Sequence, residues 1–153
     1  MHVGAEKPAV LVVVGHYLPG FKAGGILRSV CNLVDHLHDR FSFFVLTRDR
    51  DFGDAAPYAD VETGRWTTVG PAQVYYLPPD ACGAAGIVRV VNSRPFALVY
   101  LNSFFEPMCV HVLTGMLLGR VPRVPTVLAP RGEFAWASLR IKYAKKLVYM
   151  VLA

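Results

Sequence analysis

The sequence predicts an α/β fold: a doubly wound, Rossmann-like, mostly parallel sheet with helices on both faces. Residues 9–14 read AVLVVV, a continuous apolar run without polar alternation, which is typical of a strand covered on both faces. Residues 26–37 then repeat apolar positions at spacings of three and four, which indicates an amphipathic helix packed on that sheet. Short apolar strands and helical segments alternate along the rest of the chain.

The later elements follow the same alternation, because each expected strand is a short apolar or aromatic run bounded by Pro, Gly or polar residues. Strands are expected at residues 41–47, 74–77, 96–101 and 126–129, and helices at 81–92, 105–118 and from 135 onward. Gly83 and Gly86 weaken the helix predicted at 81–92. Residues 48–71 are polar and rich in Asp, and we expect a long insert there.

The positive charge is concentrated near the end of the chain. The formal net charge is +5, from 16 Lys and Arg against 11 Asp and Glu. Up to Leu118 there are nine basic and ten acidic residues; after it there are seven basic residues, and Glu133 is the single acidic one. This distribution argues against a nucleic-acid partner, which favours a basic face spread over the fold, and predicts a local anionic contact.

Cysteine usage and hydropathy predict a cytoplasmic protein. Cys31, Cys82 and Cys109 are far apart and lack metal-ligand spacing, so we expect buried free thiols in a reducing compartment. The first residues carry no signal-peptide pattern, and the longest later apolar stretch, residues 108–118, is too short to span a bilayer. We expect residues 135–153 to form a basic amphipathic helix whose charged face is either solvated or in peripheral contact with anionic lipid at the inner membrane face.

The loop after the first strand is a candidate anion site, since ligands of open α/β sheets bind beyond the carboxyl ends of the strands. Gly24 and Gly25 open the following helix. Unpaired N–H groups and the positive dipole end attract anions there, and residues without Cβ let a phosphate approach. The alternative is that both glycines only turn the chain.

Two nucleotide motifs do not fit this loop. Residues 15–22 approach a P-loop, but Phe21 separates Gly20 from Lys22, and Ala23 stands where the magnesium-binding hydroxyl belongs. The dinucleotide fingerprint G-x-G-x-x-G is also absent. We therefore expect neither a P-loop enzyme nor a hydride-transferring oxidoreductase.

Other strand ends carry further candidates. Asn102 and Ser103 follow the fourth predicted strand and suit the hydroxyls of a sugar-like ligand, or they cap the next helix. Arg131 follows the fifth strand and can hold a phosphate or carboxylate, or it pairs with Glu133 or lies in solvent. His16 lies in the loop just after the first strand, where it can contact a ligand. No cluster has metal-ligand spacing, and no Ser/His/Asp order can be placed.

Three of these loops together resemble a known family. Residues 19–25 read PGFKAGG and are followed by Arg28 and Ser29; residues 100–105 read YLNSFF, and residues 129–134 read APRGEF. In this order, on these loops, they resemble the N-terminal domain of glycosyltransferase family 4. The segment 137–149, with its paired lysines, is similar to the basic helix that follows in that family.

The resemblance implies one lobe of a GT-B architecture. Such enzymes are metal-independent retaining transferases without a cofactor; the C-terminal domain binds a nucleotide-sugar donor, and the N-terminal domain binds a glycan or lipid-linked acceptor. Residues 1–134 would form the N-terminal lobe and residues 135–153 the start of the following helix, cut short. The donor domain would lie beyond Ala153, so we expect no transferase activity from this polypeptide alone.

The resemblance also implies roles for single residues. Gly24 and Gly25 would meet the donor diphosphate. Arg131 stands where many members carry a His near the reacting sugar, and its cation would stabilise charge on the leaving phosphate. The acceptor side would be formed by His16, Lys22, Asn102, Ser103 and Glu133.

A stand-alone, non-catalytic α/β binding module is the alternative interpretation. The nucleotide sequence downstream of Ala153 separates the two. A reading frame that continues into a second β/α pattern with two Glu seven residues apart favours the transferase, whereas a natural stop favours the module.

Overall fold

The computed structural model describes residues 6–133 and confirms an α/β fold with a six-stranded, mostly parallel sheet. Helices and strands alternate along most of the chain, as the apolar runs predicted. In chain order the elements are β1 (Ala9–Val13), α1 (Gly25–Leu37), β2 (Ser42–Arg48), β3 (Trp66–Val69), β4 (Ala72–Leu77), the 3-10 turn η1 (Pro79–Ala81), α2 (Ala84–Val91), β5 (Leu98–Asn102), α3 (Pro107–Leu117) and β6 (Thr126–Ala129).

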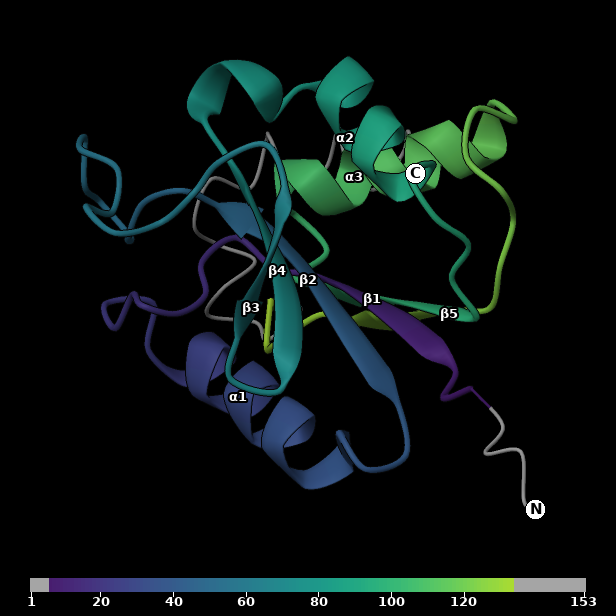
Figure 1. The fold of residues 1–153 in the computed structure, drawn as a ribbon. Helices are drawn as coiled ribbons and strands as arrows, with labels where there is room; N and C mark the ends of the chain where they lie inside the picture. The colour runs from purple at the N-terminus through teal and green to yellow at the C-terminus, as the bar shows by residue number, and fades with distance from the viewer. Residues whose placement is uncertain (1–5, 134–153) are drawn as a thin grey trace.

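The strand order in the sheet is β3-β4-β2-β1-β5-β6. Every pair of neighbours is parallel except β3 and β4, which are antiparallel. The chain moves outward in one direction from β1 through β2 and in the other through β5, so the order reverses between β1 and β5 (Figure 1). A crevice at the carboxyl ends of these two strands is where ligands of such sheets bind.

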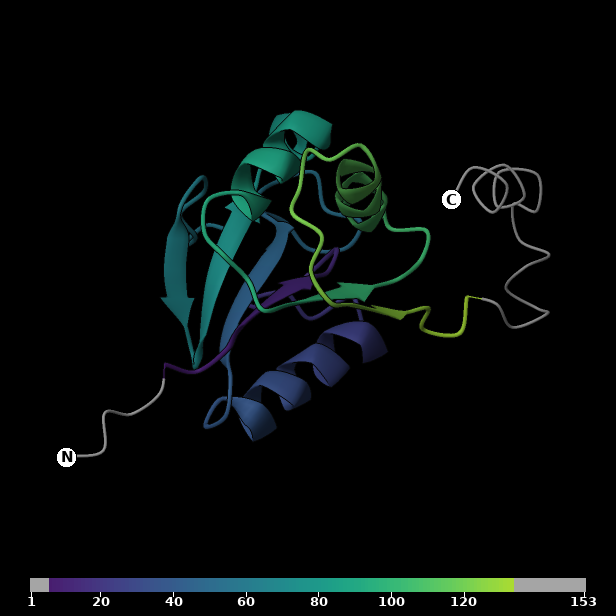
Figure 2. The same cartoon turned by 90° about the vertical axis from the view of Figure 1, so that its right-hand side faces the viewer.

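Helices cover both faces of the sheet, α1 on one side and α2 and α3 on the other (Figures 1 and 2). Alternate residues of β1 enter the two cores: Val12 packs with Val30 and Val34 of α1, while Leu11 packs with side chains of α2 and α3 such as Ile87. Burial on both faces explains why β1 is apolar at every position.

The long polar insert contains a strand that the sequence did not predict. β3 forms a hairpin with β4, and the turn between them includes Gly70 in the left-handed region, at φ 57°. Trp66 anchors β3, because its ring packs against Phe44 at 5.3 Å and Tyr75 at 5.2 Å between centroids. These partners lie outside the insert, so its own polar composition concealed the strand.

The structure leaves the C-terminal part of the chain undescribed, from residue 134 onward. The basic helix predicted at residues 135–153 lies outside the described residues, and the division of the chain at residue 134 stays a prediction. Within residues 6–133, none of the helices has the length and apolar character needed to cross a membrane.

Thr47 is a fully buried polar residue on β2. Among residues 6–133, the Oγ1 atom of Thr47 is buried without a hydrogen-bond partner. Removing an unsatisfied buried polar group relieves its desolvation penalty, so Thr47→Val is expected to raise the free energy of unfolding by about 1 kcal/mol in urea denaturation. Thr67→Val is the matched control: the Thr67 hydroxyl bonds the Val74 carbonyl at 3.2 Å, and its loss should not stabilise the fold. A destabilised Thr47→Val would contradict the prediction.

Candidate functional site

A cavity of about 240 Å³ lies at the carboxyl edge of the sheet, at the reversal of strand order. The loops after β1 and β5 form its walls, together with the first turn of α1, the N-cap of α3 and Phe52 of the insert after β2. Its lining residues are Val14, Gly15, His16, Lys22, Ala23, Ile26, Phe52, Asn102, Ser103 and Glu106. Four of the predicted acceptor residues are therefore together in one cavity: His16, Lys22, Asn102 and Ser103.

The N-terminus of α1 borders this cavity through Ala23 and Ile26. Gly24 is the N-cap residue with φ 65°, a conformation that favours glycine, and no side chain caps the helix. The first N–H groups of a helix have no partner inside the helix. A Cβ added at Gly24 or Gly25 would meet nothing within 4 Å, so open space lies over this backbone. The arrangement can receive an anion.

Asp51 holds the loop after β1 in place. The residue is only 4% exposed. Its carboxylate accepts hydrogen bonds from the backbone N–H of Phe21 at 2.8 Å, Phe52 at 2.8 Å and Lys22 at 3.2 Å. Burial acts to raise the pKa of the Asp51 carboxyl, but these backbone donors outweigh it and hold the pKa below its ordinary value. A charged acceptor thus joins the loop to the insert after β2.

The side chains of Lys22 and His16 each contact the insert after β2. The Lys22 ammonium pairs with Asp54 at 2.6 Å, and this contact raises the pKa of Lys22 above its ordinary value. The Nδ1 atom of His16 lies 3.0 Å from the Arg50 carbonyl. Because a carbonyl only accepts, we assign the proton to Nδ1, which leaves Nε2 as an acceptor in the neutral ring.

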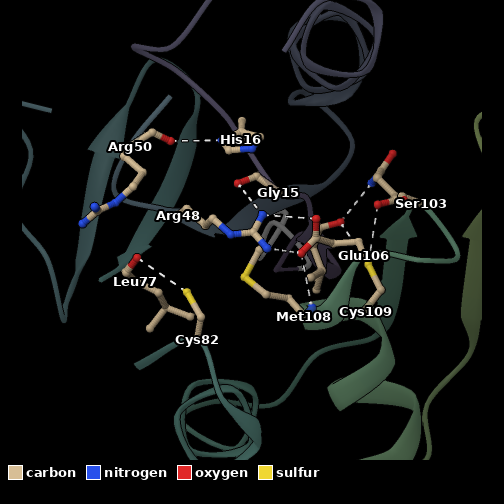
Figure 3. Close-up of polar contacts among 12 residues, drawn as sticks. Gly15, His16, Arg48, Arg50, Leu77, Cys82, Ser103, Glu106, Met108 and Cys109 are labelled. Atoms are coloured by element: carbon tan, nitrogen blue, oxygen red, sulfur yellow. Dashed lines mark hydrogen bonds and ion pairs between the residues drawn. The ribbon is translucent and has the colours of Figure 1, made fainter. Parts of the chain in front are cut away.

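An ion pair between Arg48 and Glu106, absent from the sequence predictions, supports the floor of the site (Figure 3). Arg48 donates from Nη2 to Oε1 at 2.5 Å and from Nη1 to Oε2 at 3.1 Å, and it also reaches the Gly15 carbonyl at 3.3 Å. Burial lowers the pKa of Arg48, but Glu106 outweighs it and raises that pKa. A Cβ on Gly15 would come within 2.7 Å of both side chains, so the pair packs directly on the β1 loop.

A local signal for these two residues existed in the sequence. Arg48 is the last residue of β2, at the edge of the sheet where ligands bind. Glu106 precedes Pro107 and is the N-cap of α3, where it accepts from the Met108 N–H at 3.4 Å. An acidic cap before a proline is a recognisable helix start. Their pairing across 58 positions was not readable from the sequence.

Arg131 lies in the turn after β6, and the hydrogen bonds of its guanidinium are made to side chains of α1 and β5. It donates to Ser29 Oγ at 2.7 Å, to Tyr100 Oη at 2.9 Å, and to Asn102 Oδ1 at 2.5 and 3.2 Å. Asn102 is 1% exposed, and its amide nitrogen donates to the Val13 carbonyl at 3.4 Å. Arg131 is not among the cavity-lining residues, and the catalytic role predicted for it stays a prediction.

Glu133 joins the loop after β5 to the turn after β6. Its carboxylate accepts from the Ser103 hydroxyl and from the Phe104 N–H, the latter at 2.5 Å. Ser103 has φ 86°, an unusual value for a residue with a side chain, and this contact holds it there. Glu133 itself does not line the cavity, so its predicted acceptor contact is also untested.

The cysteines do not form a nucleophilic centre in the described part of the chain. All three thiols are free; Cys109 is buried as predicted, but Cys31 and Cys82 are only partly buried, because each lies at the margin of its core. Burial raises the pKa of Cys109 to about 12 and also raises the pKa of Cys82. Thiols with raised pKa values are poor nucleophiles. Within residues 6–133, no three His, Cys, Asp or Glu side chains are grouped to hold a metal ion.

The chain matches no protein-family model, no curated protein and no solved structure.

Proposed function

We propose that the chain is the N-terminal, acceptor-binding lobe of a GT-B glycosyltransferase that transfers a sugar, with retention, from a nucleotide-sugar donor to a glycan or lipid-linked acceptor. The observation that carries the proposal is the open N-terminus of α1 beside a polar cavity at the reversal of strand order. The N-terminus of α1 suits a diphosphate, and the polar cavity suits a hydroxylated acceptor. A transferase needs both within reach of each other.

The anion-binding half of the proposal rests on the backbone. Gly24 and Gly25 leave the first turn of α1 uncovered, and the helix dipole places positive charge at this end. A diphosphate here would accept hydrogen bonds from N–H groups that otherwise point to solvent.

A non-catalytic binding module is the second candidate, and the engagement of Arg131 favours it. The predicted catalytic cation already makes hydrogen bonds to Ser29, Tyr100 and Asn102, which assigns it a part in joining α1, β5 and the turn after β6. The sites described in residues 6–133 would then bind ligands without transferring a sugar. An assay of sugar transfer by a polypeptide that includes any downstream reading frame separates the two candidates.

Substitution of Gly25 tests the anion site directly. Gly25→Val adds a side chain where a Cβ meets nothing within 4 Å and where φ is not positive, so the fold should tolerate it. The same side chain would block an approaching phosphate. We expect the affinity for inorganic pyrophosphate and uridine diphosphate, measured by calorimetry, to fall by about tenfold or more.

Gly83→Val is the matched control, because Gly83 is the N-cap at the start of α2, has open space over its Cβ position and is not among the cavity-lining residues. It should leave the affinity unchanged. Equal affinities of the wild type and Gly25→Val, or an absence of diphosphate binding by the wild type, would refute the anion site.

A further inference from the structure

Phe52 presents an aromatic ring to the cavity. It is 64% exposed although it is a large apolar side chain, and it lines the cavity wall. Two contacts hold it there: its N–H donates to Asp51, and the ring of His16 meets it at 5.6 Å in an edge-on arrangement of 89°. An exposed aromatic ring on a fixed backbone is a platform on which a ligand with an apolar face can stack.

Glu106 lies in the same cavity and has one acceptor position that no donor within residues 6–133 uses. An ionised carboxylate offers about four lone-pair positions. In residues 6–133 three donors reach Glu106: the two Arg48 nitrogens and the Met108 N–H, with two of these donors on Oε1 and one on Oε2. The Glu106 side chain is only 14% exposed, and a buried acceptor is usually paired. One position on Oε2 is therefore open to a ligand.

The other polar groups of the cavity are also mainly acceptors. His16 presents Nε2 as an acceptor in its neutral form, and the Ser103 hydroxyl, whose proton is donated to Glu133, offers its lone pairs. Lys22 is the cation of the cavity lining, and Asp54 pairs with it. Walls rich in acceptors select an uncharged ligand that donates several hydrogen bonds, and they disfavour a phosphate.

From these observations, we propose that the cavity binds one sugar ring, stacked on Phe52 and donating a hydroxyl hydrogen bond to Glu106. Drug-sized ligands occupy pockets of about 300–1,000 Å³, so a cavity of about 240 Å³ suits a single ring rather than a longer chain. This inference rests on the proposed function for its place on the acceptor side. It adds two specificity-determining residues, and Arg48 becomes the positioning residue that fixes the Glu106 carboxylate.

The stacking contact is tested with methyl α-glucopyranoside, methyl α-mannopyranoside and methyl α-galactopyranoside, whose binding is followed by saturation-transfer NMR. Phe52→Leu keeps an apolar side chain without a flat ring and should weaken binding of the preferred glycoside by about three- to tenfold. Phe52→Trp restores the ring and should retain binding. Phe21→Leu is the matched control: Phe21 is 79% exposed and also bonded to Asp51, but it is not in the cavity lining.

The Glu106 contact is tested with ligand analogues on the wild type and with one conservative variant, Glu106→Gln. Among the monodeoxy analogues of the preferred glycoside, one should bind about tenfold more weakly to the wild type, as expected for a lost hydrogen bond to a charged group. Glu106→Gln, confirmed as folded by circular dichroism, should bind that analogue and the parent glycoside nearly equally.

The possible results separate this inference from the proposed function. Diphosphate binding without binding of any glycoside overturns the sugar subsite and leaves the anion site standing, whereas loss of both overturns the proposed function as well. Equal binding by wild type and Phe52→Leu overturns the stacking contact. If no glycoside binds and both Phe21→Leu and Phe52→Leu reduce sedimentation with phosphatidylglycerol vesicles, the two rings form a lipid contact and the inference fails.

Discussion

Replacing Asp51 with alanine is expected to lower the free energy of unfolding by about 2–3 kcal/mol, because hydrogen bonds to a charged acceptor are the stronger ones. The carboxylate accepts from three backbone N–H groups, those of Phe21, Lys22 and Phe52, and without it all three lose their partner. The loop after β1 would then separate from the insert. Urea denaturation measures the loss, and amide hydrogen exchange of Phe21 and Phe52 locates it.

The same contact predicts how stability depends on pH. The pKa of the Asp51 carboxyl is below its ordinary value in the folded protein. Its contribution is therefore complete above the ordinary Asp pKa of about 4 and is lost as the pH falls through the lowered folded pKa. Asp51→Asn should be less stable than the wild type at neutral pH, and the difference should shrink on acidification.

Asp54→Asn is the matched control for this loop. It removes an exposed carboxylate whose ion-pair partner within residues 6–133 is the Lys22 side chain, so its effect on stability should be small. If Asp51→Ala and Asp54→Asn were equally stable, the backbone contacts of Asp51 would not hold the loop.

Replacing Arg131 with methionine is expected to cost about 2–4 kcal/mol of unfolding free energy. The variant loses the hydrogen bonds to Ser29, Tyr100 and Asn102, and it leaves the Oδ1 atom of the buried Asn102 without its donor. Arg131→Lys should recover little, since an ammonium cannot reproduce the fork of the guanidinium.

Arg123→Met is the matched control, because Arg123 is exposed and, in the part of the chain that the structure describes, makes one long hydrogen bond, at 3.4 Å, to the Met116 carbonyl. Urea denaturation of the variants and the wild type measures the free energy of unfolding of each. An Arg131→Met variant as stable as the wild type would mean that the guanidinium does not join the three elements and is free for a catalytic role.

The local spacing of apolar residues was sufficient to predict most strands and helices of the fold. The uninterrupted apolar run of β1 is what burial on both faces of a parallel sheet requires, and the apolar spacing of α1 is what packing on one face requires. β3 was not predicted, since its anchor Trp66 is stabilised by Phe44 and Phe96, which lie far from it in the sequence. The polar residues next to Trp66 in the sequence do not indicate which side chains it packs against.

The candidate site, like the fold, could be predicted from the sequence only in part. Features that depend on neighbouring residues were readable in the sequence: the glycine opening of α1 and the polar residues that follow β1 and end β5. Which of these residues meet depends on how the chain packs. Ser29 and Arg131 are 102 positions apart, and Arg48 and Glu106 are 58 apart. They come together because the carboxyl ends of parallel strands lie at one edge of the sheet. The packing of side chains at that edge determines which of them line the cavity and which lie behind its walls.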